Sequence, residues 1–496
     1  MPVVDRFIRK YVFFKDELAY KQFLDEAKSY KFSNFSKNDI KNLARKYGLP
    51  YGEAYSIISF YSLLNADKNA ILACNSPACN NSILSENIIK THCLGLCDKD
   101  YAFIKNEEQV YYDGENFKPI DKTIILNKNL DDCLILKKKE REYYINSLNN
   151  LLLLNKDELL NWVKNSGLSG RGGANFPTFK KLEIAKNIDS QIKYLVCNID
   201  ESEPFVFKDR ALIEINPDVA VSGAILSAYI IGATDIVFYI RGEYIKQKNI
   251  LKKTIDNFLS DISFLKKINI HIVSGAGAYV CGEETALIES FEGKRGRPRI
   301  KPPYPLESGI YNKPTVVNNI ETLSYLFEVC NLKIVNLDKR LISVSGDVNK
   351  KGIVEIDSDN SINDILEKFC DGVVGKAKFA ILGGASGFFI DKKDFGKRLK
   401  DFNTNFVGSI FIASEIRDKL EFLKYFVSFF ADESCGQCIP CYRGYKKLLE
   451  KFNCQKNEIN ETEVKTLVES MCVSTRCGLG KAIKNAINSY FASCYD

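Results

Sequence analysis

The spacing of hydrophobic residues gives the chain a helical start, an alternating middle and a helical end. Over residues 1–65 apolar positions recur three and four apart, as in amphipathic helices. Three stretches show this spacing: 13–30, 37–47 and 52–64. Short apolar runs then appear at 70–73, 101–104 and 110–113. We therefore expect helices followed, over residues 70–118, by a small α/β or ferredoxin-like unit.

Strand and helix patterns alternate between about residues 155 and 330. Strands are expected at 193–198, 235–240 and 269–274, and helices at 217–232 and 243–259. Asn216 and Pro217 suit the cap and first position of the first of these helices. The alternation predicts a largely parallel sheet with helices on both faces. Ligands of such sheets bind beyond the carboxyl ends of the strands.

The last third of the chain reads as a β-grasp unit followed by helices. Residues 341–345 and 352–356 predict a hairpin, Ser361 caps a helix, and 378–382 predicts a strand. From residue 415 onward the pattern is helical, with breaks at the cysteines. The Lys-rich stretch 127–142 is the best candidate for a linker.

Composition and charge favour an ordinary globular protein of several domains. The chain has 496 residues and a net charge of +6 without a strongly basic block, which argues against nucleic-acid binding. The start lacks an apolar signal core, and the longest apolar stretch, 219–233, is too short to cross a bilayer. Eight of the 16 cysteines fall into two groups, which favours a reducing, cytoplasmic compartment over disulfides.

The C-terminal group of cysteines has the spacing of a [4Fe-4S] site. Cys435, Cys438 and Cys441 are three residues apart, and Cys477 follows at a distance. Three closely spaced thiolates hold one face of a cubane, and a remote fourth completes it. Structural zinc is the alternative, although zinc sites usually pair two separated C-x2-C hooks.

Neighbouring residues shape this loop and leave a second candidate ligand. Gly436 and Gly444 are expected to allow a tight backbone, and Pro440 to keep the loop from becoming helical. Cys472 competes as the fourth ligand. We favour Cys477, because glycines follow it, whereas Cys472 lies near a helix end.

The N-terminal group has the spacing of a [2Fe-2S] site. It consists of Cys74, Cys79, Cys93 and Cys97, a C-x4-C pair followed by a C-x3-C pair. Zinc or unligated thiols are the alternatives. His92 could imitate a Rieske-type ligand, but four cysteines suffice and we interpret it as a bystander.

Two kinds of loop in the middle of the chain suit a cofactor. Gly170 and Gly172 begin a dinucleotide-like motif, but Asn175 stands where its last glycine belongs, so the motif is weak and a simple flexible loop is the alternative. Its glycines still let backbone N–H groups reach a phosphate or a flavin. Five acids follow two strands, and they predict a binding crevice: Asp200, Glu201, Glu203, Glu283 and Glu284.

Several long motifs resemble one known family. They are SGLSGRGGANFPT, CNIDESEP followed by FKDR, GAGAYVCGEETALIESFEGKRGRPRIKPPYP, NKPTVVNNIETL and ESCGQCIPCYRG. Together they resemble the 51 kDa flavin- and NADH-binding subunit of respiratory complex I. The N-terminal part resembles its 24 kDa neighbour, so the chain looks like a fusion of the two. Related fusions occur in NAD-dependent formate dehydrogenases and NAD-linked [FeFe] hydrogenases.

The resemblance implies specific site residues. It implies that FMN is bound by Gly170, Arg171, Gly172, Lys181, Asn198, Asp200, Gly282, Glu283, Asn318 and Asn319. It implies that NADH stacks on the flavin near Phe176, Glu203, Glu284, Lys301 and Tyr304. Of these, Phe176, Glu284 and Lys301 are the expected catalytic contacts, and Glu201 and Tyr279 are expected to complete cofactor binding. It assigns the [4Fe-4S] cluster to the C-terminal cysteines and the [2Fe-2S] cluster to the N-terminal ones.

The resemblance also implies an α/β multidomain fold. The expected parts are a helical and thioredoxin-like [2Fe-2S] domain (1–126), a linker (127–154), a Rossmann-like FMN/NADH domain (155–332), a ubiquitin-like β-grasp domain (333–398) and a helical [4Fe-4S] domain (399–496).

The chain departs from the family where glycines are usual. Asn175, Phe179 and Phe205 replace them, and the two phenylalanines would narrow the nicotinamide pocket. The main hypothesis is an NADH dehydrogenase module that passes electrons through FMN and the clusters to a partner iron–sulfur subunit of a complex I-type enzyme. It would be cytoplasmic and meet the membrane only through partners. The alternatives are an electron relay with a blocked pocket, or the diaphorase subunit of a formate dehydrogenase or hydrogenase.

Overall fold

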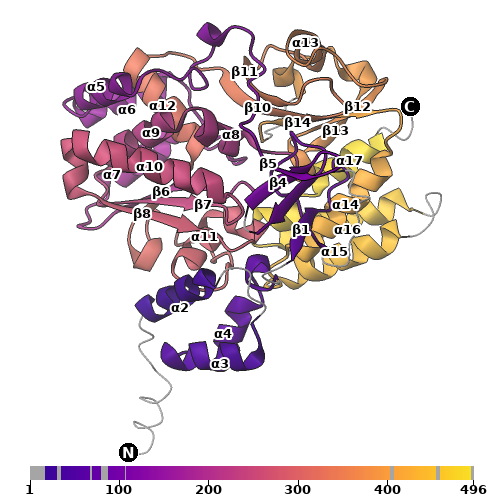
Figure 1. Ribbon diagram of the computed structural model, residues 1–496, viewed down its shortest axis with the longest axis horizontal. Coiled ribbons are helices and arrows are strands. Elements are labelled where there is room, and N and C mark those ends of the chain that lie inside the picture. The colour runs from indigo at the N-terminus through magenta and orange to yellow at the C-terminus, as the bar shows by residue number, and fades with distance from the viewer. Residues whose placement is uncertain are drawn as a thin grey trace, which may run out of the picture.

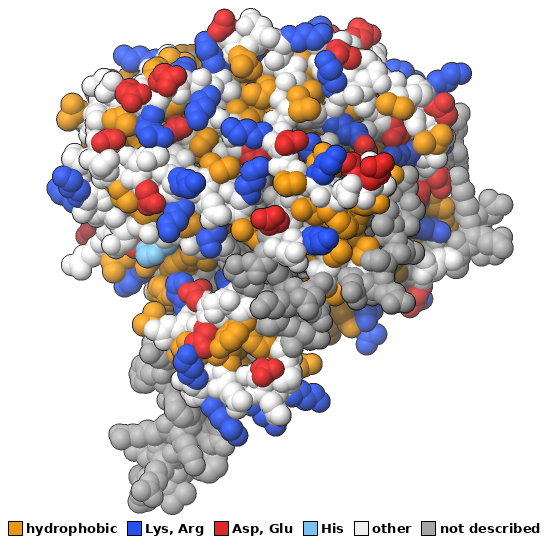
Figure 2. Space-filling model, in the orientation of Figure 1, with side chains coloured by type: hydrophobic (Ala, Val, Ile, Leu, Met, Phe, Trp, Pro, Cys, Tyr) orange, Lys and Arg blue, Asp and Glu red, His pale blue; other side chains and the backbone are white. Residues whose placement is uncertain are grey.

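The described residues form a mixed α/β structure with three sheets of five, five and four strands (Figure 1). The computed structural model describes residues 17–30, 35–66, 70–79, 88–106, 108–402, 407–453 and 459–492. Figure 2 shows basic and acidic side chains interspersed over the visible face, without a stripe of one sign. No single helix in the described ranges is long and apolar enough to cross a membrane, and the bent pair Lys208–Ile215 and Pro217–Ile231 passes only by length and composition.

Helices at the start of the chain project from the main body (Figure 1). They are α2 (Glu17–Ser29), α3 (Lys37–Lys46), α4 (Tyr51–Ile58) and the 3-10 turn η1 (Ser62–Leu64). Ser36 and Asp39 form a capping box at the start of α3. The predicted helices are confirmed here, except that residues 13–16 of the first lie outside the described residues.

The first five-stranded sheet has the order β2-β1-β3-β4-β5. Its strands are β1 (Ile71–Cys74), β2 (Ile88–Thr91), β3 (Ala102–Lys105), β4 (Glu108–Tyr112) and β5 (Phe117–Pro119). β1 pairs with β2 in parallel and with β3 antiparallel. The three expected strands are confirmed within two residues. β2 and β5 escaped prediction because their side chains are largely exposed and carry no apolar run.

The four-stranded sheet is fully parallel, with the order β8-β7-β6-β9. Its strands are β6 (Tyr194–Ile199), β7 (Asp235–Ile240), β8 (Asn269–Ser274) and β9 (Thr315–Asn319). The surrounding helices are α5 (Arg141–Leu151), α6 (Lys156–Asn165), α7 (Thr178–Asn187), α8 (Lys208–Ile215), α9 (Pro217–Ile231), α10 (Ile245–Asp261), α11 (Glu284–Phe291) and α12 (Ile320–Leu332). The prediction of a parallel sheet is confirmed, and β9 is added to it.

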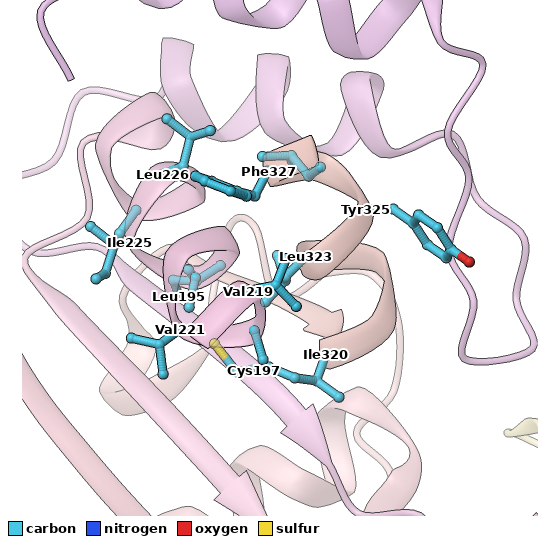
Figure 3. Packing of buried hydrophobic residues seen from close by; sticks show 14 of the residues in the cluster. Leu195, Cys197, Val219, Val221, Ile225, Leu226, Ile320, Leu323, Tyr325 and Phe327 are labelled. Carbon is cyan, nitrogen blue, oxygen red and sulfur yellow. The ribbon is translucent and has the colours of Figure 1, made fainter. Parts of the chain in front are cut away.

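Helices α9 and α12 pack side by side over β6 (Figure 3). Leu195 and Cys197 of β6 are fully buried beneath them. A Cβ added to Gly223 would lie 2.0 Å from the Leu323 carbonyl oxygen, so only glycine lets the helices approach this closely. As predicted, Asn216 caps α9, and Gly232 ends it with left-handed backbone.

The second five-stranded sheet has the order β11-β10-β14-β12-β13. Its elements are β10 (Lys339–Gly346), β11 (Gly352–Asp357), α13 (Ile362–Lys368), β12 (Ala377–Leu382), β13 (Phe388–Asp391) and β14 (Ser409–Ser414). β10 and β11 form the predicted hairpin, and Ser361 caps α13 as expected. Because β10 pairs in parallel with β14, the sheet is mixed.

The chain ends in the helices α14 (Lys419–Asp432), α15 (Ile439–Phe452), α16 (Glu461–Ser474) and α17 (Lys484–Ala492). Two expectations about the cysteine loop are wrong. Pro440 lies inside the first turn of α15, where a missing N–H costs nothing. Gly444 lies within α15, and a Cβ there would come 2.5 Å from Met471 Sδ, so its role is close helix packing.

The stretch expected to be a linker is packed against the second five-stranded sheet. Ile135 and Leu136 are fully buried. The Glu355 carboxylate accepts hydrogen bonds from the N–H groups of residues 134–136 and from the Tyr325 hydroxyl. Burial raises the pKa of Glu355 to about 7, although these donors favour the charged form.

We expect Glu355→Gln to lower the free energy of unfolding by about 2 kcal/mol, because an amide N–H₂ would face three backbone donors. Tyr325→Phe, which removes one donor and leaves the carboxylate, should cost about 1 kcal/mol. Because burial raises the folded pKa of Glu355 from 4.5 to about 7, the folded state holds the carboxyl proton more tightly than the unfolded chain, and stability should fall as the pH rises from 4.5 through 7. Urea unfolding measures both effects. Equal stability of Glu355→Gln and wild type would contradict this role.

Candidate functional site

The loops that follow β6 and β8 meet at the carboxyl edge of the parallel sheet. Asn198 Nδ2 donates to the Gly282 carbonyl at 3.1 Å, and Asn198 Oδ1 accepts from the Asp200 N–H at 2.9 Å. A Cβ on Gly282 would lie 3.6 Å from the Asp200 carbonyl oxygen. Topology therefore brings these predicted site residues together, as expected of a parallel sheet.

The glycine-rich loop lies against the start of α12. A Cβ on Gly172 would stand 3.3 Å from Asn319 Cβ, and the Arg171 N–H donates to Thr322 Oγ1 at 2.9 Å. The Gly170 N–H donates a hydrogen bond to the Phe176 carbonyl at 2.9 Å, across the loop. Backbone hydrogen bonds therefore fix the loop beside the end of β9.

Two buried polar atoms at this edge lack protein partners. Asp200 Oδ2 and Asn318 Nδ2 are buried and make no hydrogen bond to the described residues. Burial raises the pKa of Asp200 to about 7. Buried polar atoms are nearly always hydrogen-bonded in native proteins, so this pair indicates a polar ligand. A flavin, with a polar ring edge and ribityl hydroxyls, fits such a site.

Asn319 has a different environment from its neighbour Asn318. Its Nδ2 donates to Asp209 at 2.6 Å, and its Oδ1 accepts from Lys208 at 3.2 Å. Lys208 also forms buried ion pairs with Asp209 at 2.6 Å and Glu321 at 3.0 Å. The Asn319 side chain thus belongs to a buried charge network that joins α8 to α12.

Glu201 corrects the expectation that five acids line one crevice. It is buried, and its carboxylate accepts from the N–H groups of Asp209 at 2.8 Å and Arg210 at 3.1 Å. The Tyr244 hydroxyl donates to it at 3.1 Å. Glu201 therefore satisfies two free N–H groups at the N-terminus of α8 and does not need a ligand.

Glu203 and Tyr279 connect the two acidic loops to the second five-stranded sheet. The Tyr279 hydroxyl donates to Glu203 at 2.6 Å, and the Ser386 N–H donates to its other oxygen at 2.8 Å. Burial raises the pKa of Glu203 to about 7. The pair therefore fixes the two loops relative to each other.

Lysines neutralise the remaining two acids. Lys301 Nζ donates to Glu283 at 2.9 Å and to Glu284 at 2.7 Å. Burial lowers the pKa of Lys301, but the two carboxylates outweigh it and raise the pKa. Glu283 also caps α11, and Lys181 lies 3.8 Å from Glu284. Two predicted FMN contacts, Lys181 and Glu283, and two predicted NADH contacts, Glu284 and Lys301, therefore form one charge-balanced group.

Three predicted residues lie apart from these contacts. Arg171 donates to the Lys339 carbonyl at 3.0 Å and lies 5.9 Å from the centre of the Tyr325 ring, so its guanidinium turns toward β10. Phe176 and Tyr304 are 44% and 54% exposed. Both aromatic rings are available to a ligand, but no contact joins them to the carboxylates.

The Phe205 ring does not narrow a pocket at the sheet edge. It is fully buried, with its centre 4.8 Å from that of Phe411 and 5.9 Å from that of Phe426. Its φ of 70° is left-handed, which explains why glycine is usual at this position. Phe179 packs partly buried against the helices beside the parallel sheet. The hypothesis of blockage by Phe205 is therefore wrong.

The four N-terminal cysteines converge in the interior. Cys74, Cys79, Cys93 and Cys97 are all buried, and the sulfurs of Cys93 and Cys97 are 3.3 Å apart. The Cys79 and Cys93 thiols raise the pKa of Cys74. Among the described residues, no group of three or more His, Cys, Asp or Glu side chains is arranged to hold a metal ion as it stands. The thiols gather in one place, and zinc and a [2Fe-2S] cluster both stay open as their ligand.

Three arginines that sequence analysis missed hold this cysteine loop. Arg241 donates to the Cys93 carbonyl, and to the Glu201 carbonyl at 2.9 Å. Arg210, fully buried, pairs with Asp98. Arg417 donates to the Pro77 carbonyl. The FKDR motif, which contains Arg210, was the available signal.

The C-terminal cysteines also form one group. Burial, followed by the thiols of Cys438, Cys477 and Cys435, raises the pKa of Cys441 to about 12. The charged neighbours of Cys472 are instead Lys484, Glu469 and Lys481. These environments favour Cys477 over Cys472 as the fourth ligand.

Family models match two parts of the chain. Residues 163–328 match the Nuo51 FMN-binding domain. Residues 421–496 match the NADH-ubiquinone oxidoreductase-F iron-sulfur binding region. The first contains the sheet edge with the unpartnered Asp200 and Asn318, and the second contains the C-terminal cysteines. The predictions of FMN and a [4Fe-4S] cluster are thereby confirmed, and the [2Fe-2S] cluster stays a prediction.

Relatives extend these matches. The F subunit of NADH-quinone oxidoreductase from Aquifex aeolicus is 38% identical over 339 residues, 64% of this chain and 79% of that protein. The NAD-reducing hydrogenase HoxS subunit alpha of Cupriavidus necator is 35% identical over 362 residues, 67% of this chain and 58% of that protein. A crystal structure of an NAD+-reducing [NiFe]-hydrogenase in the H2-reduced state matches with a TM-score of 0.84 and 25% identity, over 96% of this chain and 91% of that one. This chain therefore belongs to the family of the NADH-quinone oxidoreductase F subunits.

Proposed function

We propose that this chain oxidises NADH at the carboxyl edge of the parallel sheet and delivers the electrons through its cysteine-bound clusters to a partner iron–sulfur subunit. The unpartnered buried pair Asp200 and Asn318, inside the FMN-binding family match, carries the proposal. FMN, when bound, accepts a hydride from NADH and releases the electrons one at a time.

The protein's part is to bind and orient. Asn318 donates to the flavin and Asp200 offers it a carboxyl oxygen, while Gly172 and Gly282 keep side chains away from it. Lys301 meets the pyrophosphate of NADH, because it is the cation that pairs with both Glu283 and Glu284. Phe176 and Tyr304, both exposed, supply aromatic faces for NADH.

We assign the five predicted parts, 1–126, 127–154, 155–332, 333–398 and 399–496, to the observed layers. The three sheets lie in the first, third and fourth parts, apart from β14, which precedes the C-terminal helices. Residues 127–154 connect the first and third parts while packing on Glu355. The N-terminal thiols hold a [2Fe-2S] cluster, supported by the burial of all four.

The parent assembly is proposed from two observations. Identity to the F subunit of NADH-quinone oxidoreductase favours a complex I-type enzyme, with cytoplasmic location and membrane contact through partners. The hydrogenase structure matches 96% of this chain, including the N-terminal cysteine unit, which favours the diaphorase subunit of a hydrogenase as the second candidate. The alternative of an electron relay with a blocked pocket now depends on Phe179 alone, because the Phe205 ring lies in the aromatic core.

Protein purified without oxygen should contain one FMN and about six irons per chain, four and two from the two cluster types. Cys438→Ser should remove the four-iron EPR signal and leave FMN bound, because the cysteine lies outside the FMN-binding match. Cys472→Ser should retain both the four-iron signal and FMN, since the neighbours of this thiol are charged side chains and not the other cysteines. Zinc in place of about two irons would refute the [2Fe-2S] assignment.

Asn318→Ala should weaken FMN binding by about tenfold without lowering the melting temperature of the flavin-free protein. The side chain has an unpartnered donor, and one hydrogen bond contributes roughly 0.5–1.5 kcal/mol. Asn319→Ala is the matched control: it should lower the melting temperature, because it strips a partner from buried Asp209. Fluorescence titration measures the affinity for FMN, and calorimetry of the flavin-free protein measures the melting temperature. Unchanged FMN affinity in Asn318→Ala would exclude this flavin contact.

Lys301→Ala should raise the KM for NADH by about ten- to a hundredfold in ferricyanide reduction, with FMN content unchanged. A charge-assisted contact contributes roughly 1.5–3 kcal/mol, and the variant leaves two carboxylates facing an anion. Lys301→Arg keeps the charge and should change the KM far less. A wild-type KM in Lys301→Ala would remove this residue from the nucleotide site.

A further inference from the structure

Helix α14 packs directly on the N-terminal cysteine loop. Tyr425 belongs to the same buried cluster as Cys93 and Cys97. Its ring stacks on Phe429, one turn later, with centres 6.3 Å apart, and Phe429 meets His92 at 5.1 Å. Because His92 precedes Cys93, this face of α14 lies beside the second pair of cysteines.

The Tyr425 hydroxyl is a buried donor without a protein acceptor. The residue is 9% exposed, and its oxygen makes no hydrogen bond to the described residues. The hydroxyl therefore lies unpaired in the buried cluster that also contains Cys93 and Cys97, two of the four predicted ligands.

A second buried tyrosine, in contrast, has a hydrogen-bond acceptor within the protein. Tyr445, on α15 beside the C-terminal cysteines, donates its hydroxyl to the Leu479 carbonyl at 2.6 Å. Its hydrogen bond is satisfied within the protein. The Tyr425 hydroxyl can donate in the same way but has no acceptor among the described residues, and a group held by the neighbouring thiols would supply one.

We propose that the Tyr425 hydroxyl donates a hydrogen bond to a sulfur of the N-terminal [2Fe-2S] cluster and raises its reduction potential. The inference rests on the proposed binding of two irons by these thiols. The cluster gains one electron and one negative charge on reduction, and the O–H dipole stabilises that charge. No bond breaks, and the proton stays on the tyrosine oxygen. Tyr425, from the C-terminal helices, thus adjusts the reduction potential of a cluster in the N-terminal part.

The test is a redox titration of the full-length holoprotein, followed by EPR of the [2Fe-2S] signal. Tyr425→Phe keeps the ring and removes only the donor. At a fixed potential it should lower the ratio of reduced to oxidised cluster by about tenfold, which is about 59 mV for one electron. Iron content should stay at the wild-type value. Tyr445→Phe, the matched control, should leave this potential unchanged.

The reduction potential and the iron content of the variants together decide the role of Tyr425. A lower potential with full iron in Tyr425→Phe supports the proposal. Full iron with an unchanged potential overturns it, and so does loss of two irons, since that would make the tyrosine structural. A shift of equal size in Tyr445→Phe would also overturn it, because the effect would not be local. Wild-type protein with about four irons would instead refute the underlying [2Fe-2S] assignment.

Discussion

Buried arginines join the N-terminal cysteine unit to the rest of the chain, and the position of the predicted N-terminal cluster relative to the sheet edge depends on them. Arg241 is the central one, because its guanidinium bonds the carbonyls of both Cys93 and Glu201. One side chain thereby ties the cysteine loop to the loop that presents Asp200. Arg210 and Arg417 attach the same unit to α8 and to the end of β14. Guanidinium groups suit this role because they stay charged when buried and donate in several directions.

The carboxyl edge of the parallel sheet supplies the second constraint. Parallel strands deliver all their following loops to one edge, so residues distant in sequence meet there. The polar residues at this edge are of two kinds, those paired within the protein and those with an unpaired atom. Glu201 and Asn319 complete helix caps and buried ion pairs, whereas Asp200 and Asn318 keep an oxygen and a nitrogen unpaired. Unpaired buried polar atoms are costly, and we propose that a bound flavin removes that cost.

Local patterns predicted the elements with strong local signals. The strands β7 and β8 and the cap of α9 followed from apolar runs and from Asn216-Pro217. Exposed edge strands such as β2 carry no such signal. The arginine contacts were out of reach, because Arg210, Arg241 and Arg417 bond residues 112, 148 and 340 positions away. The sequence also does not give the direction of a side chain. Asp200 and Glu201 are adjacent in the chain, and only the fold shows that Glu201 binds the N-terminus of α8 while Asp200 keeps an unpaired oxygen.

The central claim is that electrons enter from NADH at the sheet edge and reach clusters held by both cysteine groups. Anaerobic titration of the holoprotein with NADH, followed by absorbance and EPR, tests it most directly. The account predicts that NADH bleaches the flavin absorbance and that EPR signals of reduced clusters appear with it. Protein with full FMN and iron that dithionite reduces but NADH does not would contradict the account.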